Sequence, residues 1–253
     1  MTNPRNLLAA SMVATLSTTA FAETLKAVPA TLDPTKAYVL VEYRLMADPY
    51  SDLPTSRKSM PLNEGLALAR YDAVRRDIRG LGRAQSNPVP ANQEAIERFS
   101  NRVIAKSDGS RLMLLAVEPD TWVVAGYGNT SFSLGSYAFN LAPGTVTDLG
   151  VVEAARDWAQ GDRQANGGDL LKMAFLGPFA KRPAIAPIRA AFRPRTASDL
   201  PVPTTISSAA VRRVTFVPNA QFGNYLGGLV NRIEGVNATA RAGSQTSAPS
   251  LRE

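Results

Sequence analysis

Two carboxylates near the middle of the chain are of the right type for catalysis. Asp148 and Glu153 lie in a segment rich in strand-forming residues, and a pair of acids can perform general acid and base catalysis, as in glycoside hydrolysis. That chemistry needs carboxyl groups about 5–10 Å apart across a cleft, which spacing along one segment does not provide. Asp148 more simply marks a turn or strand end. A carboxylate-dependent hydrolase acting on envelope polysaccharide is therefore the alternative hypothesis.

The absence of histidine and cysteine removes most other catalytic chemistry. A Ser-His-Asp triad, a cysteine nucleophile, a disulfide and a thiolate zinc site all need one of these residues. Ser–Lys acyl transfer would survive, but no Ser-x-x-Lys occurs, and the nearest frame runs from Thr55 to Lys58. These exclusions favour a non-catalytic protein without a cofactor.

A glycine-rich segment from 161 to 169 contains three oxygen ligands, Asp162, Asn166 and Asp169. Such residues suit calcium, but the segment lacks the spacing and the closing glutamate of an EF-hand loop. An ordinary flexible loop is therefore predicted, and no metal site.

Positive charge is concentrated between residues 178 and 213, where seven basic and one acidic side chain give +6 of the total +7. Frequent prolines predict an extended arm, either laid over the fold or loose. A solvated linker is one interpretation. The other is an arm that binds lipopolysaccharide, phospholipid head groups or acidic polysaccharide through Coulomb attraction. The predicted anion-binding residues are Lys181, Arg182, Arg189, Arg193, Arg195, Arg212 and Arg213.

The segment from Arg111 to Val152 is predicted to form the central strands of the fold, which would position the acidic and basic residues named above. Residues 112–117 form an unbroken apolar run, which predicts a strand buried on both faces. A Pro-Asp turn leads to a second strand at 122–128, and residues 136–141 alternate, which predicts one buried and one wet face. A Pro-Gly turn at 142–145 precedes a further strand. Several short strands joined by tight turns are typical of a sandwich or barrel.

The closing part of this segment resembles exported bacterial β-sandwich domains of unassigned function. The resemblance covers Arg111 to Gly150 and rests on a frame F-x-L-x-P-G-x-V-T-D-L-G that starts at Phe139. Asp120 departs from it, since such domains usually have Gly there. The resemblance implies a fold and export, and no catalytic residues.

Other elements are predicted by local pattern. Residues 37–46 alternate as a strand, and Asp-Gly at 108–109 predicts a hairpin. Residues 66–82 fit either a helix or two strands around a turn at 72–77, and the flanking glycines favour strands. A short helix is predicted at 93–100, and a short helix or loop at 221–233.

Residues 1–22 predict a secretory signal peptide. Arg5 is the positive charge, Leu7 to Leu16 is the apolar run, and Ala20 to Ala22 is the A-x-A cleavage site. The mature chain should begin at Glu23, in the periplasm, outside the cell or at its surface, where nucleic acid is not an expected partner. No transmembrane span is predicted in it, because no other segment is apolar over about 20 residues.

Together these patterns predict a mainly β protein, an antiparallel sandwich of about seven to nine strands. Long Pro-rich loops, short accessory helices and disordered termini accompany the sandwich. The predicted division is a signal peptide at 1–22, the sandwich at 23–177, a basic Pro-rich arm returning to an edge strand at 178–218, and a short helix with a disordered tail at 219–253. The predicted function is a non-catalytic structural or binding module of the cell envelope.

Overall fold

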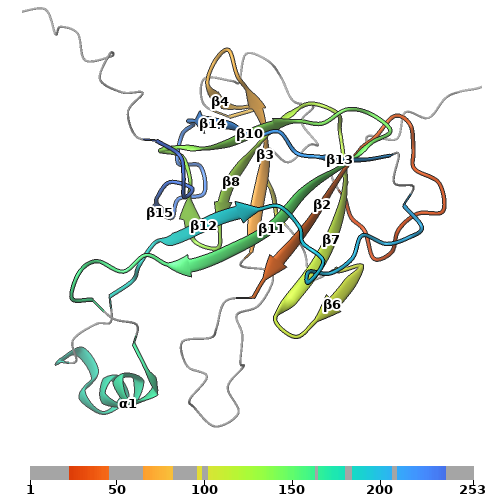
Figure 1. The fold of residues 1–253 in the computed structure, drawn as a ribbon. Helices are drawn as coiled ribbons and strands as arrows, with labels where there is room; N and C mark the ends of the chain where they lie inside the picture. Colours follow the sequence, from red (N-terminus) through yellow and green to blue (C-terminus); the bar gives the residue numbers. More distant parts are fainter. Residues whose placement is uncertain are drawn as a thin grey trace, which may run out of the picture.

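Strands make up most of the regular secondary structure (Figure 1). This computed structural model describes residues 23–45, 65–81, 96–98, 102–162, 165–179, 184–206 and 210–237. These ranges hold fifteen strands, of which eight have four or more residues, with one α-helix and a 3-10 helix. The elements are β1 Glu23–Thr24, β2 Ala37–Arg44, β3 Leu66–Asp72, β4 Asp77–Ile78, β5 Ile96–Arg98, β6 Ala105–Ser107, β7 Ser110–Val117, β8 Thr121–Tyr127, β9 Thr130–Ser131, β10 Ser136–Asn140, β11 Val146–Arg156, α1 Gly167–Leu176, η3 Gly177–Phe179, β12 Ile188–Arg193, β13 Val211–Arg213, β14 Val217–Ala220 and β15 Leu229–Val230.

The first sheet, sheet I, is centred on β2. This strand pairs antiparallel with β7 over eight residues and in parallel with β11 on its other side. The full order is β1-β7-β2-β11-β12, with β6 on β7 and β13 on β11. Val, Leu and Tyr dominate β2 and β7, and such residues suit a pleated surface that is packed on both faces.

The second sheet, sheet II, has the order β14-β10-β8-β3-β4, with β5 on β3, β9 on β8 and β15 on β9. Its pairings are antiparallel except for β9 with β15. The prediction of a mainly β, largely antiparallel, sandwich-like fold is thus confirmed.

Apolar side chains fill three layers. The main core lies between the sheets and includes Val39, Met113, Val124 and Phe139. A second cluster covers the outer face of sheet II, where Phe222 and its neighbours pack on β3 and β8. A third covers the outer face of sheet I, where the Pro-rich arm packs on β2 and β7. Part of the arm therefore lies over the fold, and residues 188–193 and 211–213 join sheet I as β12 and β13.

These outer layers correct the prediction that β10 has a wet face. Ser136 and Ala138 are buried, and only Asn140 of that face is exposed. In β2, Val39, Val41 and Tyr43 face the main core as predicted, and the alternating residues Tyr38 and Leu40 are also buried, under the arm. The pattern failed because the covering segments, residues 200–206 and 220–225, come much later in the chain.

Several local predictions are confirmed. Residues 66–78 form two strands, β3 and β4, around a turn. β6 and β7 form the Asp-Gly hairpin, where Gly109 has a φ of 71°. Gly144 has a φ of 68° in the Pro-Gly turn that leads into β11.

The helix predicted at 93–100 is wrong in its described part, because residues 96–98 form β5. At residues 221–233 the loop alternative holds, since these residues form turns and β15. The helix that does form, α1, lies in a segment expected to be a loop. Its N-terminus has a capping box, in which the Asn166 side chain accepts from the Asp169 amide and the Asp169 side chain accepts from the Asn166 amide. Such reciprocal bonds satisfy amides that a helix start leaves free.

Within the described ranges, no helix has both the length and the apolar character needed to cross a membrane. The predicted signal peptide and the tail after residue 237 lie outside the described residues.

Candidate binding cavity

A fork in sheet I creates the main candidate site. The outer edge of β11 pairs in parallel with β13 at residues 146–148 and antiparallel with β12 at residues 151–156. Between these two pairings the register of β11 against β2 shifts. Gly150 lies at the shift with a φ of 81°, and a Cβ there would collide with the carbonyl oxygen of Arg193. The close approach of the two backbones requires glycine at this position.

A cavity of about 950 Å³ lies at the fork, which is a volume suited to a small-molecule ligand. Its walls are mostly apolar and come from β11, β12, the arm and the chain after β13. Three arginines and Asp148 supply the charge. The lining residues are Asp148, Leu149, Gly150, Phe192, Arg193, Pro194, Arg195, Thr196, Val202, Pro203, Thr204, Ile206, Val211, Arg213, Val214 and Phe216.

Aromatic rings form one wall and connect the cavity to the main core. Phe216 stacks on Tyr137 with ring centroids 4.9 Å apart, and it meets Phe192 edge-on at 5.2 Å. Phe139, in the core, lies 5.9 Å from Phe216. Ring pairs at these separations are favourable beyond the area that they bury. The wall is therefore held in place by the core and not by a ligand.

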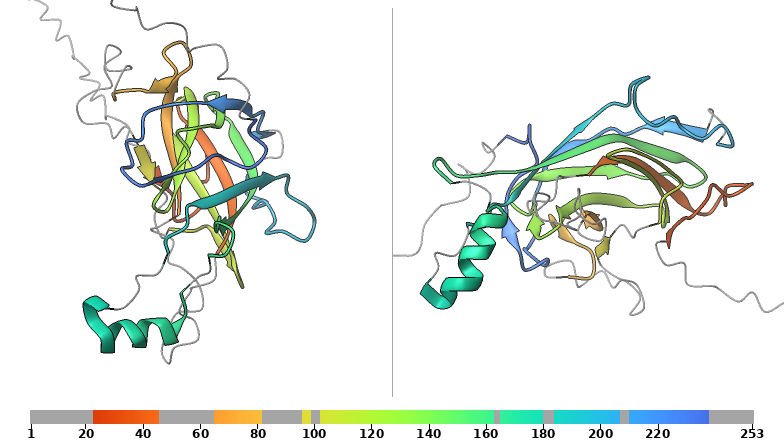
Figure 2. Two further views of the ribbon diagram at one scale, coloured as in Figure 1. Left: turned by 90° about the vertical axis from the view of Figure 1, so that its left-hand side faces the viewer. Right: turned by 90° about the horizontal axis from the view of Figure 1, so that it is seen from below.

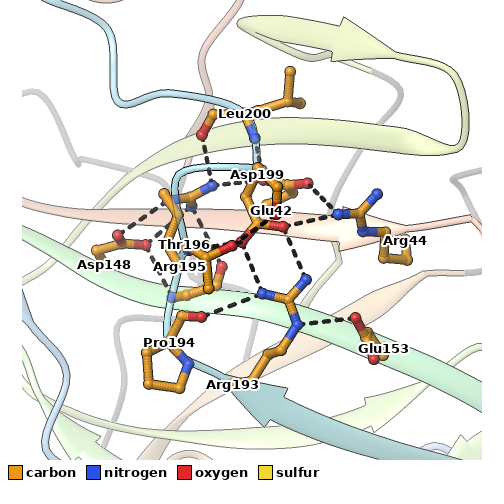
Figure 3. Close-up of polar contacts among 12 residues, drawn as sticks. Glu42, Arg44, Asp148, Glu153, Arg193, Pro194, Arg195, Thr196, Asp199 and Leu200 are labelled. Atoms are coloured by element: carbon orange, nitrogen blue, oxygen red, sulfur yellow. Dashed lines mark hydrogen bonds and ion pairs between the residues drawn. The ribbon is translucent and has the colours of Figure 1, made fainter.

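An ion-pair network fixes the arm beside the cavity (Figure 3). Arg193 holds Asp199 with two bonds of 2.7 and 2.8 Å, and its Nε donates to Glu153 at 3.0 Å. Arg44, from β2, donates to the same Asp199 at 2.8 Å. The Asp199 side chain is 0% exposed, so both carboxylate oxygens depend on these donors and on Thr196.

Hydrogen bonds within this network shift the pKa values of Asp199 and Arg193. The pKa of Asp199 lies well below its ordinary value, chiefly because Arg193 donates hydrogen bonds to it. Thr196 and Arg44 add to the effect. The same bond raises the pKa of Arg193. Hydrogen bonds to the charged form of a group favour that form.

Arg195 is fully committed to partners inside the protein. It donates to both carboxylate oxygens of Asp148, at 3.1 and 3.2 Å, and to Glu42 at 2.7 Å. Its remaining bonds go to the carbonyl oxygens of Leu200 and Gly150. These bonds involve all three guanidinium nitrogens, and the group has five donors in all. Arg195 therefore has no donor to spare for a ligand.

Four acids and three arginines make up the network, which leaves it with a formal charge of −1. Three of the acids, Glu42, Asp148 and Glu153, belong to the sandwich. Because these acids pair with arginines of the arm, they neutralise part of the arm's positive charge.

The predicted anion-binding residues therefore do not share one environment. Arg193 and Arg195 are internal partners of carboxylates, and Arg189 is half exposed and 3.8 Å from Glu234. Arg212 and Arg213 are exposed on β13, and no ion pair of either is found among the described residues. Arg213 lines the cavity and Arg212 does not. Lys181 and Arg182 lie outside the described residues.

The carboxylates of the alternative hypothesis are also engaged. Asp148 is held by Arg195 and Glu153 by Arg193, and both acids project from one strand, β11. In the calcium hypothesis, Asn166 and Asp169 instead cap α1. No cluster of three or more acids able to hold a metal occurs in the described ranges.

The aromatic wall and the carboxylate partners of the arginines were not predicted from the sequence. Glu42 is the one available signal, because it is a lone acid inside an otherwise apolar strand. A charge at such a position needs a partner when it is buried. The partner, Arg195, is 153 residues away, and local patterns do not reach that far.

Comparison with known proteins adds nothing to this geometry, since no family model, curated protein or solved structure matches the chain.

Proposed function

We propose that the protein is a non-catalytic binding module of the cell envelope, and that its fork cavity takes an anionic amphiphile. The ligand would have an apolar body and one anionic group, as a fatty acid or the acyl part of an envelope lipid has. The observation that carries the proposal is the cavity itself, which combines an aromatic wall with an exposed arginine, Arg213, at its edge.

The apolar wall supports an apolar ligand body. Phe192, Val214 and Phe216 are only partly buried although they pack against the core, so they offer surface to the cavity. Apolar surface that leaves water on binding favours association by about 25 cal/mol per Å².

The charge balance supports one anionic group and not several. Arg195 is saturated and Arg193 has most of its donors engaged, so Arg213 is the lining cation left for a ligand among the described residues. A polyanion such as an acidic polysaccharide would instead need a broad cationic face.

The envelope location rests on the signal-peptide pattern of residues 1–22 and on the resemblance to exported domains. The first strand, β1, begins at Glu23, directly after the predicted cleavage site. A non-catalytic role is supported by the absence of histidine and cysteine and by the ion pairs that hold Asp148 and Glu153. Turnover of an envelope polysaccharide that disappears in Asp148→Asn would support the hydrolase alternative.

Titration with dodecanoate, followed by calorimetry, tests the proposal. Dodecanoate should bind, and dodecanol should bind more weakly because it lacks the charge. Arg213→Gln should weaken dodecanoate binding about threefold to tenfold, as expected for one partly exposed ion pair. The difference between the two ligands should shrink as salt screens the pair.

Two variants make the test specific. Arg212→Gln removes an equal charge from the same strand but outside the cavity, so it should leave the affinity unchanged. Thr204→Trp places a large side chain on an exposed lining position and should block binding without touching the core. Dodecanoate binding that is absent, or equally strong in Thr204→Trp, would contradict the proposal.

A further inference from the structure

An unusually long connection links two strands that pair directly. β11 and β12 are antiparallel neighbours from Val151–Arg193 to Arg156–Ile188, so residues 157–187 form the hairpin connection. A hairpin of this kind needs only two to five residues. The additional chain carries α1 and η3, and Figures 1 and 2 show α1 standing clear of both sheets. Connections of this length are commonly functional.

The helical part of this connection, Gly167–Phe179, is here named the finger. It contains α1 and η3, which follow one another directly, and neither makes extensive contact with a described strand. Four of its large apolar side chains are exposed, most of all Phe175 at 86% and Phe179 at 91%, with Leu171 and Leu176 more than half exposed. The helix is nevertheless well formed, because the capping box of Asn166 and Asp169 starts it.

The apolar residues surround α1 and do not form a stripe. At 100° per residue, Leu170, Leu171, Met173, Phe175 and Leu176 point in directions spread around the axis. A helix that docks in a protein groove, or on a sheet, shows one apolar face and one polar face. A helix that is apolar on all sides fits surroundings that are apolar on all sides, such as the hydrocarbon of a membrane.

Basic residues in the finger and shortly after it suit an anionic surface. Lys172 is exposed and is the only basic residue of α1. The only acid, Asp169, is engaged in the capping box. In sequence, the finger is followed by Lys181 and Arg182. Basic residues beside an apolar segment are attracted to anionic lipid head groups.

We propose that the finger is a membrane-docking element that enters one leaflet of a lipid bilayer containing anionic phospholipid. Ten helical residues span about 15 Å, half of the hydrocarbon thickness, so the finger reaches into one leaflet and does not cross. The cavity lies at the fork of β11, and its lining includes no residue of the finger. This proposal therefore does not depend on the proposed cavity ligand.

Vesicle co-sedimentation of the full chain tests the proposal. The vesicles are phosphatidylcholine alone, or the same lipid with about a third phosphatidylglycerol. The wild type should bind both and prefer the anionic vesicles. The double variant Phe175→Ser and Phe179→Ser should lose about tenfold or more in partitioning for each ring removed. Val74→Ser changes an equally exposed apolar residue elsewhere, 95% exposed in the β3–β4 turn, and should bind as the wild type does.

Residues 7–16 are also apolar and could bind vesicles themselves. A fluorescent reporter placed in the finger shows whether the finger is the segment that enters the lipid. In Phe175→Trp, anionic vesicles should shift the added fluorescence to the blue, and brominated lipid should quench it, relative to the wild type. The proposal would be overturned if the fluorescence of Phe175→Trp neither shifts nor is quenched on vesicles. It would also be overturned if the double serine variant binds vesicles as the wild type does. A dimer that depends on Phe175, without a reporter shift, would overturn it too and would make a second copy the occupant. Arg213→Gln should leave vesicle binding unaltered, which keeps this test independent of the cavity.

Discussion

At the residue scale, the arginines of the arm differ sharply in what they do. Arg193 and Arg195 resemble Arg213 in sequence context, since all lie in one basic block. In the fold, Arg195 has carboxylates on two sides, and Arg213 faces the cavity edge. Sequence composition predicted the amount of charge but not its pairing, because the acids come from β2 and β11.

The Asp199 carboxylate should be the most important acid of the network for stability. Asp199→Asn keeps the shape but removes the charge that Arg193 and Arg44 share. We expect a loss of about 2–3 kcal/mol in the free energy of unfolding, between the values for exposed and buried pairs. Urea unfolding at neutral pH measures it. The matched control is Glu153→Gln, an exposed partner of the same Arg193, which should cost less than about 1 kcal/mol.

The same variant should change the pH dependence of stability. The pKa of Asp199 is depressed in the fold, so its contribution is complete above its ordinary value of 3.8 and is lost as the pH falls below that. The wild type should therefore lose stability steeply on acidification below about pH 5. Asp199→Asn should show a shallower decline, and equal slopes for the two proteins would exclude this role for Asp199.

At the element scale, β11 shows what local pattern can and cannot predict. Its residues predicted a strand after the Pro-Gly turn, and the strand is there. The pattern did not predict that two different strands share its outer edge, because β12 and β13 are recruited from later parts of the chain. α1 was missed because its Gly-rich start looked like a loop, and its signal was the Asn-x-x-Asp capping pair.

Gly150 should be essential for the fork. Gly150→Ala combines a positive φ with a collision against the Arg193 carbonyl, so we expect a loss of about 2 kcal/mol or more in stability. Urea midpoints measure it. Gly109→Ala is the control, because its φ is also positive, 71°, but nothing lies within 4 Å of the added Cβ. It should cost only about 1 kcal/mol, and equal losses would show that the close approach is unimportant.

At the scale of the whole molecule, the sandwich and the finger should be separable. Replacing residues 159–185 with a short Asn-Gly turn keeps the β11–β12 ladder and the bond from the Asp157 amide to the Pro187 carbonyl. The variant should unfold cooperatively at nearly the wild-type urea concentration, because α1 makes no extensive contact with any strand. It should still bind dodecanoate but no longer bind vesicles through the finger. Loss of cooperative unfolding would show that the finger supports the sandwich.

The parallel pairing of β13 with β11 also affects when the cavity can exist. Val146 pairs with Val211, sixty-five residues later, while β2, β7 and β11 all precede the arm. A chain that leaves the ribosome or the translocation pore N-terminus first can assemble that central ladder before residues 192–216 arrive. The cavity is then the last part to close. A compound that occupies the cavity therefore binds the fully folded protein alone and stabilises it by mass action. The apparent melting temperature should then rise with the logarithm of the concentration of that compound.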